Sequence, residues 1–406
     1  MVFFPRTFGV IRFLNTKHGP VLRTAFACIG FISTLLSTGR LSLAVQTLQE
    51  FWDGSFKLAG RRVGWYLRTS WMRWHIAHDP FFNFTDGLSH DLVVQQDAFL
   101  KRSKGRLSDE TYYGNAMLIA AHFAHDALLQ GDQTAYQTAR STYFDCAEVV
   151  LNVPSDDGIM PKTRPMEEKS YDSFRTLAAE ALAGFDGVLK QISFEWFVLG
   201  GTLLGAVREG DFLAHDHDID LGMFLEPEQI ETLVHLFADT ADFTTVKLDE
   251  RSEVLRQNNV DRTLRKSVTF LKLVHKNGVN IDIFFHEEVD GKYVHGSGAL
   301  LWENTPFQLD TYMLGGRPVL GPRDANLYLT EHYGNWTQEQ KDFSCVTDTT
   351  NIAYVQNFFT IAFHIKRLAL LSKIDTARAV QISKTMLSQK IIVDLDNRMR
   401  LSPDLF

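Results

Sequence analysis

The feature that most constrains the fold is a short stretch, residues 215–221, in which acidic residues alternate with other side chains. It reads His-Asp-His-Asp-Ile-Asp-Leu, so that Asp216, Asp218 and Asp220 stand two residues apart. Side chains two apart on a β-strand point to the same face, and Ile219 would then face the opposite way. We therefore predict a strand with one apolar, buried face and one face that carries three carboxylates.

Carboxylates lined up in this way repel one another, and each raises the pKa of its neighbours unless a cation neutralises them. Mg²⁺ and Mn²⁺ prefer oxygen ligands of this kind and commonly bridge them to the phosphates of a substrate. The pattern indicates Asp218 and Asp220 as metal ligands, with Asp216 as a further candidate. The alternative interpretation is a solvated acidic loop, since aspartates are mostly exposed on protein surfaces.

The flanking sequence predicts a mixed α and β domain around this stretch. A compact aromatic run indicates a buried strand that ends at Gly200-Gly201, after which a short helix begins. Two apolar runs meet at Lys276-Asn277-Gly278 and predict a hairpin, because Asn-Gly is a strong turn signal. The predicted elements are strands at 194–199, 219–224, 268–275 and 279–285, and helices at 172–190, 202–208 and 229–237.

Two further features bear on the chemistry of this domain. Asp282 lies within the apolar strand predicted at 279–285, where a carboxylate is costly to bury unless it is paired or bound to a metal. It is therefore either a catalytic, metal-binding residue or one half of a structural salt bridge. Gly200 and Gly201 would let a phosphate approach the backbone, and the helix that opens at Thr202 offers free N–H groups to it. The alternative for the glycines is an ordinary tight turn.

The rest of the chain is organised around this domain. Apolar residues at helical spacing in 41–52 and 113–129 predict an all-α N-terminal region. Three prolines with mixed charges in VPSDDGIMPKTRPMEEKS predict a linker. We divide the chain into a helical N-terminal domain at 1–152, a linker at 153–170, a catalytic domain at 171–345 and a helical C-terminal extension at 346–406.

The N-terminal part differs in charge from the remainder. Residues 1–78 contain ten Lys and Arg against Glu50 and Asp53, a net charge of +8, whereas the whole chain carries −8, so the remainder carries −16. Basic residues mixed with aromatic ones at 56–78 favour contact with an anionic membrane surface. The alternative is a helix whose aromatic side chains pack internally. No recognised nucleic-acid-binding module accompanies the patch, so no nucleic-acid partner is expected.

Two observations bear on location. The apolar run at 25–36 is too short to span a bilayer, which needs ~20 apolar residues. Cys28, Cys146 and Cys345 lie far apart and form no CxxC, which favours a reducing compartment. We therefore expect a cytoplasmic protein that is peripheral to the membrane if its basic segment binds lipid.

Four blocks of the sequence resemble the hallmark motifs of the LicD/fukutin family, a branch of the nucleotidyltransferase superfamily. They occur in the family's order over about residues 172–345. The blocks are LGGTLLGAVR at 199–208, HDHDID at 215–220, IDIF at 281–284, and a closing pair of YL at 328–329 and YGNW at 333–336. Together they are far more specific than the acidic stretch alone.

The chain departs from the family pattern at three positions. His215 stands in place of the usual Trp, His217 in place of the middle Asp, and Asn335 in place of the last Asp. Position 217 points away from the face that carries Asp218 and Asp220, so the metal face is kept. Asn335 removes a charge from the closing block, and a charged role at that position is not expected.

The resemblance implies a nucleotidyltransferase-like mixed sheet flanked by helices, within an α+β protein that has an all-α N-terminal domain. Family members transfer a substituted phosphate, such as phosphocholine or a polyol phosphate, from a CDP-linked donor to a glycan. The acceptor here would be a polysaccharide of the cell envelope or its lipid-linked precursor.

The same resemblance suggests roles for individual residues. Asp218 and Asp220 would hold Mg²⁺ or Mn²⁺ on the donor diphosphate. Asp282 would complete the metal site or accept the proton of the attacking hydroxyl. Arg208 is a candidate phosphate clamp, because a guanidinium binds phosphate oxygens in pairs. Its alternative is a surface position on its helix.

Two other functions stay open at this point. The same metal site would serve a nucleotidyltransferase that adds a nucleoside monophosphate to a protein, an RNA or a small molecule. Only the fate of the donor separates that reaction from phosphate transfer. The third alternative is a catalytically inactive binding module, against which the intact Asp218, Asp220 and Asp282 argue.

Overall fold

The computed structural model describes most of the chain from residue 90 onward. The described residues are 90–153 apart from 103 and 106–108, 171–406 apart from 214–215, 258–260, 340–342, 344, 346–347 and 396–397, and Cys28, Phe31, Ile32, Leu35 and Leu41. The predicted linker beyond Val153 lies outside this part of the chain. So do the basic and aromatic segment at 56–78 and, apart from Leu41, the helix predicted at 41–52.

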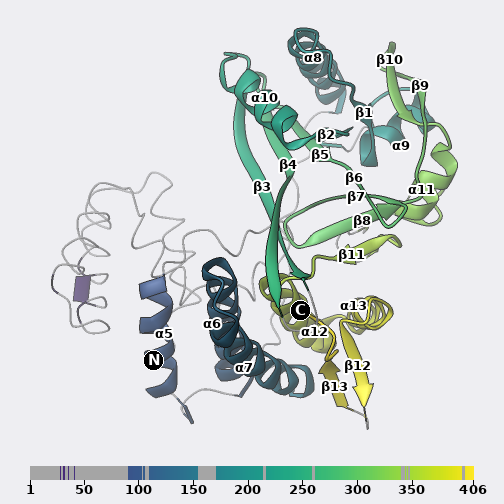
Figure 1. Cartoon of the computed structure of the whole chain (residues 1–406). Helices are drawn as coiled ribbons and strands as arrows, with labels where there is room; N and C mark the ends of the chain where they lie inside the picture. The colour runs from purple at the N-terminus through teal and green to yellow at the C-terminus, as the bar shows by residue number, and fades with distance from the viewer. Residues whose placement is uncertain are drawn as a thin grey trace.

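A five-stranded mixed sheet forms the centre of the C-terminal part of the chain (Figure 1). Its strands are, in spatial order, β1 (Phe197–Val198), β2 (Asp218–Met223), β5 (Asn280–Phe285), β4 (Arg262–His275) and β3 (Phe243–Arg256). β2 and β5 run parallel, and the other neighbours are antiparallel. The mixed sheet and the helical N-terminal part confirm the predicted α+β class, and the β4–β5 hairpin turns at the predicted Asn-Gly.

Three helices accompany this sheet, and the sequence predicts all of them. They are α8 (Tyr171–Leu189), α9 (Gly200–Glu209) and α10 (Pro227–Ala238). The boundary before α9 differs from the prediction, because β1 has only two residues and the helix already begins at Gly200. Gly200 has a φ of +54°, a left-handed conformation that glycine adopts without strain and that turns the chain directly from strand into helix.

β3 and β4 form a long hairpin that extends beyond the sheet. Each strand has 14 residues, and in Figure 1 the pair runs from α10 to the helices at the other end of the molecule. There the Gln133 side-chain amide donates to the Arg262 carbonyl oxygen at 3.0 Å. The Val254 N–H donates to the Gln356 carbonyl oxygen at 3.1 Å. The hairpin thus connects the sheet with both terminal segments.

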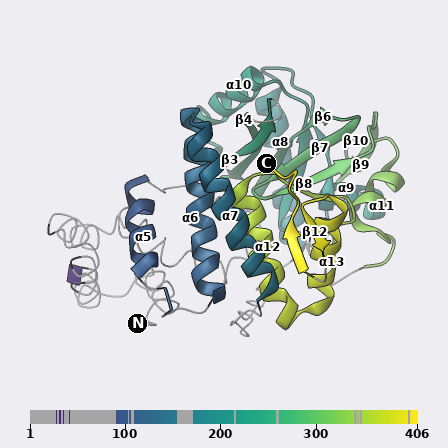
Figure 2. The ribbon, with the colours of Figure 1, turned by 60° about the horizontal axis from the view of Figure 1, so that its bottom comes forward.

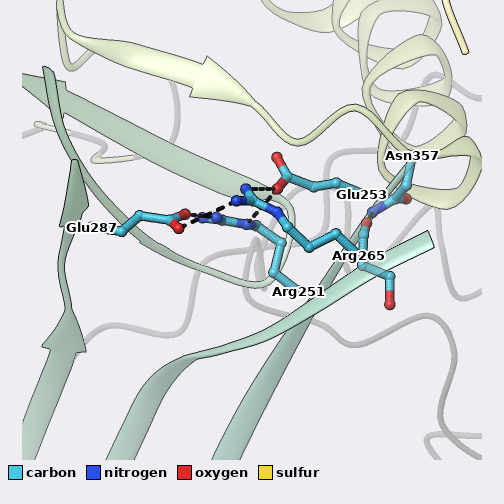
Figure 3. Close-up of polar contacts among 6 residues, drawn as sticks. Arg251, Glu253, Arg265, Glu287 and Asn357 are labelled. Carbon is cyan, nitrogen blue, oxygen red and sulfur yellow. Dashed lines mark hydrogen bonds and ion pairs between the residues drawn. The ribbon is translucent and has the colours of Figure 1, made fainter. Parts of the chain in front are cut away.

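β3 is absent from the sequence prediction because its two buried charged residues, Asp249 and Arg251, are paired with opposite charges. Arg251, whose side chain is only 3% exposed, contacts Glu253 at 3.2 Å and also pairs with Glu287. Arg265 on β4 contacts Glu253 at 2.5 Å and Glu287 at 3.5 Å, which closes a four-residue cluster (Figure 3). Asn357 donates from its side chain to the Ser252 carbonyl oxygen beside it. In the sequence, a strand with so many charged residues resembles a solvated loop, because the partners of the charges become known only with the fold.

A second, four-stranded sheet and a separate hairpin follow the central sheet. The sheet consists of β11 (Ile352–Tyr354), β8 (Leu300–Asn304), β7 (Lys292–Ser297) and β6 (Glu287–Val289), and the hairpin of β9 (Leu309–Leu314) and β10 (Arg317–Pro322). The short helix α11 (Ala325–Tyr333) comes next and begins at Asp324, whose side chain accepts from the Leu327 N–H.

The N-terminal and C-terminal segments pack against each other. The N-terminal helices are α5 (His90–Arg102), α6 (Asp109–Gln130) and α7 (Gln133–Asn152), and the C-terminal elements are α12 (Phe358–Ile374), α13 (Thr376–Ser388), β12 (Ile392–Leu395) and β13 (Arg398–Leu401). α6, α7 and α12 lie side by side in both Figure 1 and Figure 2. The buried Tyr143 hydroxyl on α7 donates to the Phe358 carbonyl oxygen of α12 at 2.8 Å. The C-terminal segment contains a strand pair besides the predicted helices.

Two sequence predictions concern the membrane and the cysteines. Among the described helices, none combines the length and the apolar character needed to cross a bilayer. Cys28, Cys146 and Cys345 are not joined by disulfides in the structure, and the reducing compartment stays a prediction.

Candidate active site

The parallel pairing of β2 and β5 brings the predicted aspartates together. Asp220 on β2 is the direct register partner of Asp282 on β5. Asp218 and Asp220 are partly exposed, whereas Ile219 between them is fully buried, so the predicted alternation is observed. The strand begins at Asp218, and Asp216 precedes it in the connecting loop instead of belonging to the strand. His215 lies outside the described residues.

The start of α9 is built around Asp220. The Leu199 N-cap supplies no side-chain hydrogen bond to the helix. The carboxylate of Asp220 caps the helix instead, since its Oδ2 accepts a hydrogen bond from the Gly201 N–H at 3.1 Å. The Asp220 N–H in turn donates to the Thr202 hydroxyl at 2.9 Å. Thr202 is fully buried and positions Asp220, and its predicted contact with substrate stays a prediction.

The two glycines are needed for close approach of carboxylates. A Cβ atom at Gly200 would lie 2.7 Å from Asp220 Oδ2, and one at Gly201 would lie 2.7 Å from Asp216 Oδ2. Neither distance is compatible with a side chain unless a carboxylate moves. The groups that approach these glycines in the structure are therefore Asp216 and Asp220, and the predicted phosphate contact stays a prediction.

The aspartates shift one another's protonation. Burial and the charge of Asp218 raise the pKa of Asp216 to about 7. Burial raises the pKa of Asp220 well above its usual value, with further increases from the charges of Asp218, Asp216 and Asp282. Burial also raises the pKa of Asp282 to about 6, although Lys272 opposes this shift. Such mutual repulsion in a shielded place is typical of sites that receive a cation.

Lys272 on β4 is a site residue that the sequence analysis does not predict. It is the register partner of Asp282, and its Nζ lies 2.8 Å from Asp282 Oδ1 and 2.9 Å from Oδ2. Lys247 follows as the register partner of Lys272 on β3 and also acts electrostatically on Asp282. The signal in the sequence is a single lysine within the otherwise apolar run Phe270–Val274, a position that requires a partner.

Two tyrosines of the closing motif, Tyr328 and Tyr333, belong to the surroundings of the aspartates. Tyr328 is 2% exposed, and its hydroxyl is buried without a hydrogen-bond partner. Burial raises its pKa, and the charge of Asp220 raises it further. The pKa of Tyr333 is raised by burial and then by Asp220 and Asp216. Tyr328 and Tyr333 of the closing motif thus lie within electrostatic reach of the aspartates, which motif order alone does not show.

Arg208 lies farther along the helix. It is in the last turn of α9, ~12 Å along the helix axis from Gly200 at 1.5 Å per residue. Its role as a phosphate clamp stays a prediction.

The carboxylates do not form a complete ligand shell as they stand. No group of three or more His, Cys, Asp or Glu side chains within the described part of the chain is arranged to hold a metal ion. Two carboxylate oxygens of the site, Asp216 Oδ2 and Asp282 Oδ1, are nevertheless buried without a hydrogen bond, although Asp282 Oδ1 lies 2.8 Å from Lys272 Nζ.

Comparison with known proteins identifies the family of this domain. A model of the LicD/FKTN/FKRP nucleotidyltransferase domain matches residues 193–323, a range that contains all four aspartates. An uncharacterised protein of Caenorhabditis elegans is 33% identical over 124 residues, which are 30% of this chain and 29% of that protein. The ribitol 5-phosphate transferases FKRP of Mus musculus and Homo sapiens are each 48% identical over 40 residues, which are 10% of this chain and 8% of theirs. The chain thus matches less than a third of the length of each of these relatives.

Proposed function

We propose that this protein transfers a substituted phosphate from a CDP-linked donor to a hydroxyl group of a glycan or lipid-linked glycan. The proposal starts from its membership of the LicD/FKTN/FKRP family, which rests on the domain at residues 193–323. The transferred group is of the phosphocholine or polyol-phosphate type. The observation that carries the proposal is the gathering of Asp216, Asp218, Asp220 and Asp282 at the glycine-rich start of α9. The FKRP relatives, named as ribitol 5-phosphate transferases, support the same class of reaction.

The residues present fit a divalent cation. Mg²⁺ is usually held by one or two protein carboxylates together with substrate phosphates, so Asp218 and Asp220 suffice as ligands. The buried, unpartnered Oδ2 of Asp216 and the raised pKa values of Asp216 and Asp220 support this choice. When bound, Mg²⁺ or Mn²⁺ would neutralise charge on the donor diphosphate and on the departing CMP.

In the proposed reaction the acceptor hydroxyl oxygen forms a bond to the phosphorus that carries the transferred group. The bond from that phosphorus to the oxygen of CMP breaks, and its electron pair leaves with CMP. The hydroxyl proton passes to a base, for which Asp282 is the candidate if it is not itself a metal ligand. Arg208 is proposed to contact a phosphate of the donor.

The test is release of CMP by the purified chain. CDP-choline, CDP-glycerol and CDP-ribitol would each be offered with Mg²⁺ or Mn²⁺ and a glycan acceptor. We expect metal-dependent CMP release with at least one donor, loss of release in Asp218→Asn, and wild-type release in Asp239→Asn, an exposed aspartate at the end of α10. Release of pyrophosphate from a nucleoside triphosphate, without CMP release from any donor, would instead identify a nucleotidyltransferase.

A membrane contact is proposed separately for the basic segment 1–78. Its support is the net charge of +8 and the mixture of aromatic and basic residues at 56–78. Binding to vesicles with anionic lipid should weaken as salt is added, because screening shortens the reach of exposed charges. Reversing the charges of Arg61, Arg62 and Arg68 should release the protein. Binding that does not respond to salt or to these substitutions contradicts the proposal.

A further inference from the structure

Tyr328 carries a buried hydroxyl that no group of the described chain satisfies. The residue lies near the start of α11 and is 2% exposed. Its ring is held in an edge-to-face contact with Phe307, at a centroid distance of 5.6 Å, while the hydroxyl has no hydrogen-bond partner. Buried donors in proteins are almost always paired, because an unpaired one gives up its hydrogen bonds to water without replacement. This hydroxyl therefore calls for a partner.

The packing around Tyr328 connects it with the face of β2 that carries Asp220. Its neighbour Phe307 also contacts the ring of Phe197, at a centroid distance of 5.5 Å. Phe197 is the register partner of Gly222, which lies two residues beyond Asp220, so the Phe197 ring lies on the same face as the carboxylate. α11 also packs against α9, the helix that Asp220 caps (Figure 1). The hydroxyl thus belongs to the surroundings of the aspartates.

The two acidic residues whose charges act on Tyr328, Asp220 and Glu331, do not hydrogen-bond with it. Asp220 Oδ2 accepts from the Gly201 N–H at 3.1 Å. Both oxygens of Glu331 accept from Thr305, whose backbone nitrogen lies 3.3 Å from Oε1 and 3.1 Å from Oε2. The acceptor for the Tyr328 hydroxyl therefore has to come from water or from a ligand.

The hydroxyl suits an anionic ligand that enters among carboxylates. Burial raises the pKa of Tyr328 above its usual value, and the charge of Asp220 raises it further, so the hydroxyl keeps its proton and can donate. A neutral donor can bind a phosphate oxygen without adding negative charge to a place that already gathers several carboxylates. Hydrogen bonds to ionised oxygens are also stronger than those between neutral groups. In the proposed donor, the ionised part is the diphosphate.

We propose that the Tyr328 hydroxyl donates a hydrogen bond to a phosphate oxygen of the CDP-linked donor. The inference rests on the proposed function and makes Tyr328 a donor-binding residue that the closing motif contributes. Tyr328 would orient the diphosphate, while the aspartates hold its cation. A water molecule is the alternative partner, and in that case donor binding would not depend on the hydroxyl.

The test is binding of CDP to the full chain in the presence of Mg²⁺, measured by isothermal titration calorimetry. Tyr328→Phe removes the hydroxyl and keeps the ring. We expect CDP to bind at least about tenfold more weakly to this variant, because a hydrogen bond to a charged oxygen is lost. The donor KM in CMP release should rise by a similar factor. Without CDP, the thermal unfolding midpoint should stay at the wild-type value or rise, since no hydrogen bond within the chain is lost.

The matched control is Tyr136→Phe on α7. Tyr136 is fully buried, and its hydroxyl also lacks a partner in hydrogen-bond geometry. Its charged neighbours are arginines, of which Arg140 acts on it most strongly, and not the aspartates. Tyr136→Phe should therefore bind CDP as tightly as wild type. Equal weakening of CDP binding in both variants would overturn the inference, because the effect would not be specific to the site.

Mn²⁺ binding without nucleotide separates a donor contact from an effect on the aspartates. Tyr328→Phe should bind Mn²⁺ as tightly as wild type, and a loss of Mn²⁺ affinity would overturn the inference, since the tyrosine would then act through Asp220. CDP binding by Tyr328→Phe at wild-type affinity would also overturn it, while metal-dependent CMP release by wild type would leave the proposed function standing. Absence of both CDP binding and CMP release in wild type would remove the proposed function and the inference with it.

Discussion

The carboxylate of Asp216 is held under conditions that favour its protonated form. Burial and the charge of Asp218 raise its pKa to about 7 from the usual value of 3.8. Below pH 4 the group carries a proton in both the folded and the unfolded chain. As the pH rises from about 4 to 7, the unfolded chain releases that proton first, so the folded, metal-free protein loses stability across this window. The acidic site is thus maintained at a cost in stability.

Asp216→Asn should therefore stabilise the metal-free protein at neutral and alkaline pH. Asparagine keeps the size of the side chain but has no charge to release. We expect the variant to unfold at a higher temperature than wild type at pH 8, in the presence of a chelator, and the difference to shrink at pH 5. The measurement is the thermal unfolding midpoint at both pH values. Asp239→Asn, an exposed control, should have the same unfolding midpoint as wild type at both pH values. A difference between Asp216→Asn and wild type that does not change with pH would contradict the account.

At the scale of elements, the start of α9 explains why two adjacent glycines stand there. Gly200 adopts a positive φ, and both glycines admit a carboxylate to within 2.7 Å of where a Cβ would lie. The atom near Gly201 is the end of the Asp216 side chain, which can move without disturbing the fold. A side chain at position 201 should therefore affect the site more than it affects stability.

Gly201→Ala should lower the rate of CMP release by roughly tenfold to a hundredfold, because it displaces Asp216 from its place beside the helix start. The unfolding free energy should change by less than about 1 kcal/mol. The matched control is Gly187→Ala on α8, where a Cβ meets no atom within 4 Å, and this variant should gain up to about 1 kcal/mol without losing activity. CMP release by Gly201→Ala at the wild-type rate would show that Asp216 is not needed in its present place for turnover.

The sequence predicts those helices and strands whose pattern lies within a short stretch of neighbouring residues. The β4–β5 hairpin follows from Asn277-Gly278, and the acidic face of β2 follows from residues spaced two apart. β3 does not, because its charges are paired with residues such as Glu287 that lie far away in the sequence. Lys272 is missed for the same reason, since only the register between β4 and β5 shows its partner. Local periodicity predicts a face, whereas pairing across strands becomes known only with the fold.

At the scale of the whole molecule, α6 and α7, the central sheet and the C-terminal segment share one buried apolar cluster. Val93 and Leu100 of α5 belong to a separate small cluster with Ile119 of α6. Phe358 at the start of α12 lies at a junction within it. Its ring contacts those of Tyr136 and Tyr143 on α7, at centroid distances of 6.0 and 5.0 Å, and that of Phe406 at 4.0 Å. Helices α6 and α7 should therefore not unfold independently of the C-terminal segment.

Phe358→Ala tests this coupling. Removal of a fully buried phenylalanine costs about 3–5 kcal/mol, and the loss should appear in a single transition of α6, α7, the central sheet and the C-terminal segment. Denaturant unfolding followed by both fluorescence and circular dichroism would measure it. Leu395→Ala, at a position that is 51% exposed, should change the unfolding free energy by less than about 0.5 kcal/mol. Two separate transitions, with only one affected by Phe358→Ala, would contradict a shared core.

The most direct test of the central claim compares wild type with Asp220→Asn in CMP release at saturating donor, with donor affinity measured separately. Asparagine keeps the size of the side chain and removes one negative charge from the proposed metal site. If the carboxylate acts through a metal that stabilises the transition state, turnover should fall by ~10²–10³ while donor affinity changes much less. Full turnover by Asp220→Asn would contradict the account, because the chemistry would then lie elsewhere in the molecule.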